Sequence, residues 1–134
     1  MRIEHLMSSP VVGVTPEATP EDAAATMLER GFTTLPVFTG SGELIGLVTE
    51  SDLGAARLIG GSDPDSGAVL GTHPTVATVM RRAVVTAAPG DEVAEVAAVL
   101  VESRQRCLPV VRDGRVAGIV SWRDLLTHLL AARR

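Results

Sequence analysis

Two aspartates each lie three residues after a hydroxyl side chain, at a point where an apolar stretch gives way to a helical pattern. The pairs are Thr49 with Asp52 and Ser121 with Asp124. A carboxylate in this place can accept hydrogen bonds from both hydroxyl groups of a ribose, and charged acceptors make the stronger bonds. The backbone N–H groups and the dipole of the helix favour a phosphate beside the hydroxyl residue. The alternative is that each aspartate only supports the start of its helix, since Asp is favoured in the first turn.

The two pairs belong to an internal repeat that covers most of the 134-residue chain. Residues 7–39 align with residues 80–112, and residues 42–53 align with residues 114–125 after a gap of one residue, with 15 identities over 45 aligned positions. The identities occur in the same order in both copies, which a shared composition would not produce. A repeat of this kind predicts two copies of one structural unit.

Each copy has the pattern of a β-α-β-β-α unit, which predicts a fold of the α/β (α+β) class. One unit has a single apolar sheet face and is too small to be stable alone, so we expect the two copies to pack sheet to sheet. The elements expected in copy one and copy two are a short lead helix at 3–7 and 75–80, a brief first strand at 10–14 and 83–87, a helix after Thr19 or Asp91, two strands at 35–38 and 44–49 or at 108–112 and 115–120, and a last helix at 51–59 and 123–132.

Local signals mark three of these boundaries. Thr19 precedes Pro20, and Asp22 lies three residues after Thr19, which is the pattern of a capping box with proline at the first helical position. Asp91 is the expected cap of the corresponding helix in copy two. The Asp-Gly pair at residues 113–114 predicts a tight hairpin turn, because both central residues of such a turn need a positive φ.

Composition limits the classes of function. The net charge of −4 argues against nonspecific binding of nucleic acid, which needs a basic surface. No apolar run approaches the roughly 18 residues of a membrane span, and the first ten residues lack an apolar signal core, so we expect a cytoplasmic protein without membrane attachment. Cys107 is the only cysteine and fits a reducing compartment. His5, His73 and His128 have no ligand spacing, so no metal site is predicted.

The two copies resemble CBS domains. In copy one the resemblance rests on Leu-Pro-Val at residues 35–37, followed by Gly-Leu-Val-Thr-Glu-Ser-Asp-Leu at residues 46–53. In copy two it rests on Leu-Pro-Val at residues 108–110, followed by Gly-Ile-Val-Ser-Trp-Arg-Asp-Leu at residues 118–125. Neither short motif is specific alone, but their repeated order and spacing make the match strong.

The resemblance implies a CBS domain at residues 1–59, a linker loop at 60–75 and a second CBS domain at 76–134. Such a tandem arrangement, often called a Bateman module, has pseudo-twofold symmetry and two clefts that commonly hold AMP, ADP, ATP or S-adenosylmethionine. The resemblance further implies that both copies contribute to each cleft. One cleft would combine Ser9, Pro10, Thr33 and Thr34 with Ser121, Arg123 and Asp124. The other would combine Arg82, Ala83, Arg106 and Cys107 with Thr49 and Asp52.

The first of these clefts is expected to be the better ligand site, because it has several hydroxyl groups and Arg123 for a phosphate. The two arginines of the second cleft either hold a polyphosphate or are solvated surface charges. We therefore expect a regulatory module that binds an adenosine-containing nucleotide, needs no cofactor and catalyses no reaction. The alternative is a ligand-free dimerisation or protein-interaction module. We also expect a homodimer formed through the helices that follow Asp52 and Asp124, acting on an unidentified regulated protein.

Overall fold

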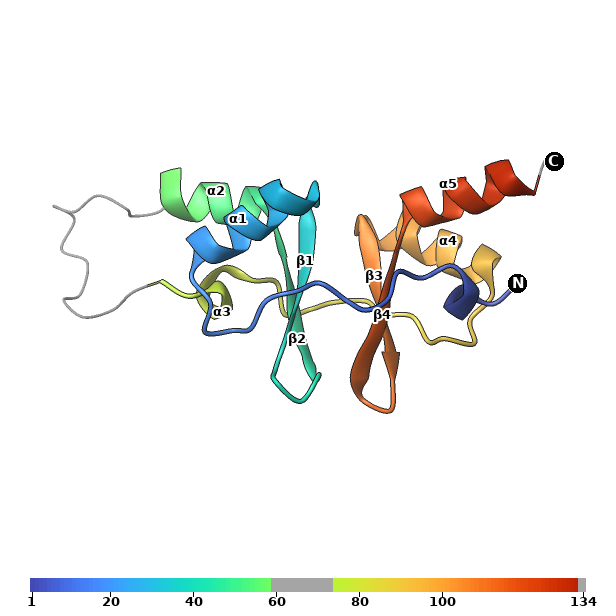
Figure 1. Cartoon of the computed structure of the whole chain (residues 1–134), viewed down its shortest axis with the longest axis horizontal. Helices are drawn as coiled ribbons and strands as arrows, with labels where there is room; N and C mark the ends of the chain where they lie inside the picture. Colours follow the sequence, from blue (N-terminus) through green and yellow to red (C-terminus); the bar gives the residue numbers. More distant parts are fainter. Residues whose placement is uncertain (59–73, 133–134) are drawn as a thin grey trace, which may run out of the picture. The chain divides into compact units, whose positions relative to one another are not determined.

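The computed structural model describes residues 1–58 and 74–132 (Figure 1). His73 and all but the last two positions of the predicted linker lie outside the described residues. The described elements are the 3-10 helix η1 (Ile3–His5), α1 (Pro20–Arg30), β1 (Thr34–Phe38), β2 (Leu44–Thr49), α2 (Glu50–Leu58), α3 (Val76–Val79), α4 (Val93–Ser103), β3 (Cys107–Arg112), β4 (Arg115–Ser121) and α5 (Trp122–Ala131). This order confirms the mixed α/β fold, with β1–β2 and β3–β4 as two small sheets.

The chain divides into two compact units. The Asp52 unit consists of Gly13–Gly40 and Ile45–Ala83, and the Asp124 unit consists of Met1–Val12, Ser41–Leu44 and Val84–Arg134. In each unit the two long helices contact each other, α1 with α2 and α4 with α5 (Figure 1). The expected packing of one sheet on the other and the pseudo-twofold symmetry stay predictions.

The short helix that precedes each copy in the sequence packs in the core of the other copy. Ile3 of η1 is fully buried in the core of the Asp124 unit, and its N–H group donates to the Asp91 carbonyl over 2.8 Å. Val76 of α3 is fully buried in the core of the Asp52 unit, and its N–H group donates to the Ala18 carbonyl over 2.8 Å. Burial of one apolar side chain in each core thus ties the lead segments to their units. The predicted domains at 1–59 and 76–134 follow the sequence copies, whereas the compact units exchange these segments.

The expected first strands are each reduced to a single parallel bridge, Val14 with Val37 and Ala87 with Val110. The Val14 N–H donates to the Pro36 carbonyl, and the Ala87 N–H donates to the Pro109 carbonyl. The next bond of each parallel ladder would need an N–H group from that same proline, which has none. The prediction of strands at residues 10–14 and 83–87 is therefore wrong, because the partner strand cannot continue the pairing.

Two of the three local signals are confirmed. Thr19 and Asp22 form the reciprocal capping box of α1, and the β3–β4 turn has positive φ at Asp113 and Gly114, 54° and 78°. The expected cap at Asp91 is wrong, because α4 is preceded by Glu92, which makes no side-chain cap. The Asp91 carboxylate instead accepts from the Ala88 N–H over 2.8 Å, inside the preceding turn.

Candidate functional site

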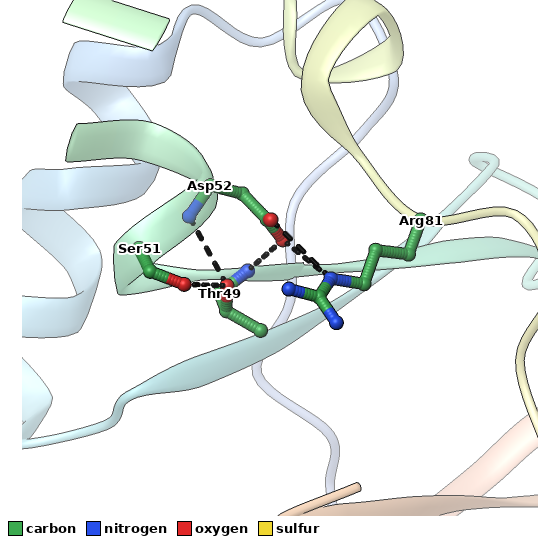
Figure 2. A network of polar contacts seen from close by, with 4 residues as sticks. All are labelled: Thr49, Ser51, Asp52 and Arg81. Carbon is green, nitrogen blue, oxygen red and sulfur yellow. Dashed lines mark hydrogen bonds and ion pairs between the residues drawn. The ribbon is translucent and has the colours of Figure 1, made fainter. Parts of the chain in front are cut away.

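The Asp52 cluster consists of Thr49, Ser51, Asp52 and Arg81 (Figure 2). Thr49 ends β2, and its Oγ1 accepts from the Asp52 N–H over 3.1 Å while Asp52 Oδ2 accepts from the Thr49 N–H over 2.9 Å. Thr49 Oγ1 also lies 3.0 Å from Ser51 Oγ. The first turn of α2 is thus closed by a capping box, which fixes the direction of the Asp52 carboxylate.

Arg81 joins this cluster from the segment that follows α3 (Figure 2). Its Nε atom donates to both oxygens of Asp52, at 3.3 Å each. Its backbone pairs with Leu47 of β2 through two hydrogen bonds of 2.7 and 2.9 Å. The pairing brings the Arg81 carbonyl so close to Gly46 that a Cβ atom added there would lie 2.5 Å from it, which explains why a residue without a side chain stands at this position.

The Asp124 cluster has the same cap. Ser121 ends β4, and Asp124 Oδ2 accepts from the Ser121 N–H over 2.8 Å and from the Ser121 hydroxyl over 3.2 Å. Asp124 Oδ1 lies 3.5 Å from the Ser8 hydroxyl, and Ser8 pairs with Ile119 of β4 as Arg81 pairs with Leu47. Both aspartates therefore support the starts of their helices, and a role in binding ribose stays a prediction.

The two clusters differ in charge at one matched position. Ser8 and Arg81 occupy the same position in the aligned copies, one residue after the aligned Met7 and Met80. Asp124 consequently faces a neutral hydroxyl group, whereas Asp52 faces a guanidinium group. Sequence reasoning missed both residues, because it selected their neighbours Ser9 and Arg82. The aligned positions could have revealed the difference, but not the contact with the aspartate.

The other predicted site residues are divided between the units. Ser9 donates to the Ala117 carbonyl over 3.3 Å in the Asp124 unit, and the Thr33 carbonyl accepts from the Glu50 N–H over 3.0 Å in the Asp52 unit. The exposed members are Ser9, Pro10, Arg106 and Arg123 in the Asp124 unit and Arg82 and Ala83 in the Asp52 unit. The two predicted groupings each draw on both units, and they stay predictions.

Thr34 and Cys107 occupy equivalent positions in the aligned copies, and both are largely withdrawn from solvent. Thr34 Oγ1 is buried and has no hydrogen-bond partner within the described residues. Cys107 lies opposite Ser121 in the β3–β4 pairing. Burial, with a further contribution from the negative charge of Asp124, raises the pKa of the Cys107 thiol to about 12. The thiol is therefore protonated at neutral pH, which makes it a poor nucleophile.

The described part of the chain has neither a metal-binding cluster nor a membrane-spanning helix. No group of three or more His, Cys, Asp or Glu side chains there is placed to hold a metal ion. No helix of residues 1–58 and 74–132 is both long and apolar enough to cross a membrane.

The model of the CBS domain family matches the chain twice, at residues 3–57 and 76–131. The chain belongs to the CBS domain family. Among curated relatives, the uncharacterized protein MJ1225 of Methanocaldococcus jannaschii is 30% identical over 132 residues, which cover 94% of this chain and 46% of that protein. The CBS domain-containing protein YhcV of Bacillus subtilis is 26% identical over 129 residues, covering 96% of this chain and 86% of YhcV. The chain spans about half or less of several other relatives, such as 14% of an Aquifex aeolicus A-adding tRNA nucleotidyltransferase.

Solved structures show the same fold. A putative acetoin utilization protein, AcuB, from Vibrio cholerae has a TM-score of 0.83 at 23% identity, covering 98% of this chain and 92% of that one. The CBS domain pair of protein MJ0100, in complex with 5′-methylthioadenosine and S-adenosyl-L-methionine, has a TM-score of 0.79 at 24% identity, covering 100% of this chain and 98% of that one. CBSX2 in complex with AMP has a TM-score of 0.81 at 22% identity, covering 99% and 98% of the two chains. The CBS domain pair is thus a recurring architecture that this chain shares.

Proposed function

We propose that this CBS domain pair is a regulatory module that binds an adenosine-containing nucleotide and catalyses no reaction. The observation that carries the proposal is that one oxygen of the Asp124 carboxylate has only a long hydrogen-bond contact. The cap holds its Oδ2 through the Ser121 N–H at 2.8 Å, whereas the contact of its Oδ1 with the Ser8 hydroxyl is a long 3.5 Å. Because a carboxylate has about four acceptor positions, Oδ1 has room for a shorter bond from a ligand hydroxyl group.

A nucleotide fits the chemistry around this carboxylate. The two hydroxyl groups of a ribose are neighbouring donors, and a fixed carboxylate accepts from both with charge-assisted bonds. The N-terminus of the ten-residue helix α5 lies beside it, with the exposed Arg123 in the first turn, and both features favour a phosphate. Thr34 adds support in the Asp52 unit, because its buried hydroxyl lacks a partner in the described residues and an unmade bond costs roughly 1–3 kcal/mol.

Calorimetric titration of the full chain with AMP, ADP, ATP and S-adenosylmethionine tests the proposal. The ligands named for the MJ0100 and CBSX2 structures make adenosyl compounds the first choice for the panel. We expect at least one of the four to bind, and no heat with any of them would overturn the proposal.

The ranking of the two aspartates has its own test. We expect Asp124→Ala to weaken the tightest binding roughly tenfold or more, as for the loss of a hydrogen bond to a charged group, and Asp52→Ala to weaken it less. Asp124→Asn keeps a capping oxygen at the helix start and serves to separate lost binding from lost helix stability. Equal losses for the two alanine variants would overturn the ranking.

A ligand-free dimerisation module is the second candidate, and the apolar surface of α5 favours it. Leu126, Leu129 and Leu130 are 55%, 58% and 67% exposed. A groove of about 470 Å³ beside them is lined mainly by α4 and α5, including Trp122 and Leu125. Exposed large apolar side chains gathered on one element mark an interaction surface. The proposed homodimer would therefore use α5, whereas in α2 only Leu58 is a large exposed hydrophobic residue.

Light scattering of the full chain tests the homodimer. Leu129→Glu places a charge on the apolar face of α5, and we expect it to convert the dimer to a monomer. Leu28→Glu, at an 85% exposed position of α1, is the matched control and should leave the mass unchanged. A wild-type monomer at working concentration would overturn the dimer, and an unchanged mass for Leu129→Glu would exclude α5 as its interface.

We further propose that the module acts on a separate regulated protein.

A further inference from the structure

We infer that Arg81 makes the Asp52 unit selective for phosphorylated ligands. The Asp124 unit has Ser8 at the matched position and therefore lacks this source of selectivity. The inference rests on the proposed nucleotide binding and assigns a ligand preference to one of its two aspartates. It concerns a residue that is neither part of the helix cap nor among the predicted site residues.

Asp52 is already engaged by a cation. Oδ2 accepts from the Thr49 N–H at 2.9 Å and from Arg81 Nε at 3.3 Å, and Oδ1 accepts from the same Nε at 3.3 Å (Figure 2). The side chain of Asp52 is only 14% exposed. A ribose that approaches this carboxylate must therefore compete with the guanidinium group for its oxygens.

The Arg81 guanidinium group can leave the Asp52 carboxylate at low cost. The Arg81 side chain is 64% exposed, and exposed ion pairs are weak. Breaking such a pair weakens binding of the competing ligand by up to about fivefold. The Arg81 backbone stays anchored by its two bonds to Leu47, so a guanidinium group that leaves Asp52 remains within a side-chain length of the ligand.

The displaced guanidinium group can then bind a phosphate group of the ligand. An ionised phosphate offers it a bidentate partner and restores its charge pairing. Uncharged adenosine offers no such partner. Binding of a phosphorylated nucleotide thus replaces the broken ion pair by a new one, whereas binding of adenosine does not. Asp124 requires no such exchange, because Ser8 is uncharged.

The test measures the affinities of AMP and adenosine by calorimetry in the full chain that carries Asp124→Asn, so that binding reports on the Asp52 unit. Addition of Arg81→Ser, which copies the residue at the matched position, should tighten adenosine by up to about fivefold and weaken AMP, so that the preference for AMP over adenosine falls roughly tenfold or more. Arg30→Ser removes the same charge from α1 of the same unit and should leave the ratio of the two affinities unchanged. The reciprocal change Ser8→Arg, made with Asp52→Asn, should raise the preference for AMP over adenosine.

The outcomes separate this inference from the proposed function. Equal changes for AMP and adenosine on Arg81→Ser, or weaker adenosine binding, would overturn the inference. Loss of all binding in the Asp124→Asn chain, while the Asp52→Asn chain still binds AMP, would overturn it and leave the proposed function standing. Absence of binding of any adenosyl ligand to the wild-type chain would overturn both. Thermal melting of each variant shows whether the fold is retained.

Discussion

Gly46 is the position where a single added methyl group should be most damaging to the Asp52 cluster. A Cβ atom there would lie 2.5 Å from the Arg81 carbonyl oxygen and 3.0 Å from Met80 Sδ. The oxygen belongs to the backbone, so it can withdraw only if the pairing of Arg81 with Leu47 is given up. That pairing consists of two hydrogen bonds of 2.7 and 2.9 Å.

The expected cost of Gly46→Ala follows from these contacts. Two backbone hydrogen bonds contribute about 1 kcal/mol each, so the variant should lose about 2 kcal/mol of unfolding free energy. For a chain of this size a loss of about 2 kcal/mol lowers the melting temperature by roughly 6–8 °C. Urea denaturation followed by circular dichroism measures the free energy directly, and its slope shows whether the unfolded state has changed.

Two other glycines provide matched controls. In Gly118→Ala the new Cβ would meet Met7 Sδ, and it would lie 2.8 Å from Met7 Cγ and 3.1 Å from the Ser8 carbonyl oxygen. The methionine side chain is flexible and can move aside, so the expected loss is below about 1 kcal/mol. Gly54→Ala, inside α2 with nothing within 4 Å, should stabilise the chain by about 0.5–1 kcal/mol. A Gly46→Ala variant as stable as the wild type, or one less affected than Gly118→Ala, would refute this reasoning.

Two further predictions concern Cys107 and Thr19. Because burial holds the pKa of the Cys107 thiol at about 12, against 9.0 for its ordinary value, the unfolded chain releases this proton first as the pH rises. The free energy of unfolding should therefore be unaffected by this group below about pH 9 and should fall between about pH 9 and 12. In urea titrations at several pH values, a Cys107→Ala variant should lack this part of the decline. An identical decline in the variant would contradict the assignment. Thr19→Ala removes the cap of α1 and should lower the free energy of unfolding by about 1 kcal/mol in the same assay. Thr19→Asn keeps a capping side chain and should lower it by a few tenths of a kcal/mol or not at all. Equal losses for the two variants would show that the capping bond contributes little.

The elements that the sequence predicts correctly depend on local signals. The capping box at Thr19 and the positive φ of Asp113 and Gly114 involve residues within one turn, so the residue types alone specify them. The expected first strands fail for an equally local reason that the pattern of apolar residues does not express. Pro36 and Pro109 lack the N–H group that a longer parallel ladder would need from β1 and β3.

The candidate site is less predictable because its decisive contact joins residues that are distant in sequence. Arg81 lies 29 residues from Asp52 and reaches it only because α3 packs in the unit of copy one. Nothing in the spacing of Arg81 and Arg82 distinguishes the arginine that faces the carboxylate from its neighbour. The choice depends on the antiparallel pairing with Leu47, which is a tertiary contact.

The two copies share the residues that folding requires and differ at a position where folding accepts many side chains. The hydroxyl residue and the aspartate recur in both copies because each helix start uses them in the same pair of bonds. The residue facing the aspartate needs only its backbone to pair with the strand, and any side chain except proline satisfies that need. Ser8 and Arg81 therefore make the same backbone pairing with their strands. Their side chains place the Asp124 carboxylate beside a neutral group and the Asp52 carboxylate beside a cation. We therefore expect a change at this one position to alter the proposed ligand preference of one unit with little effect on its stability.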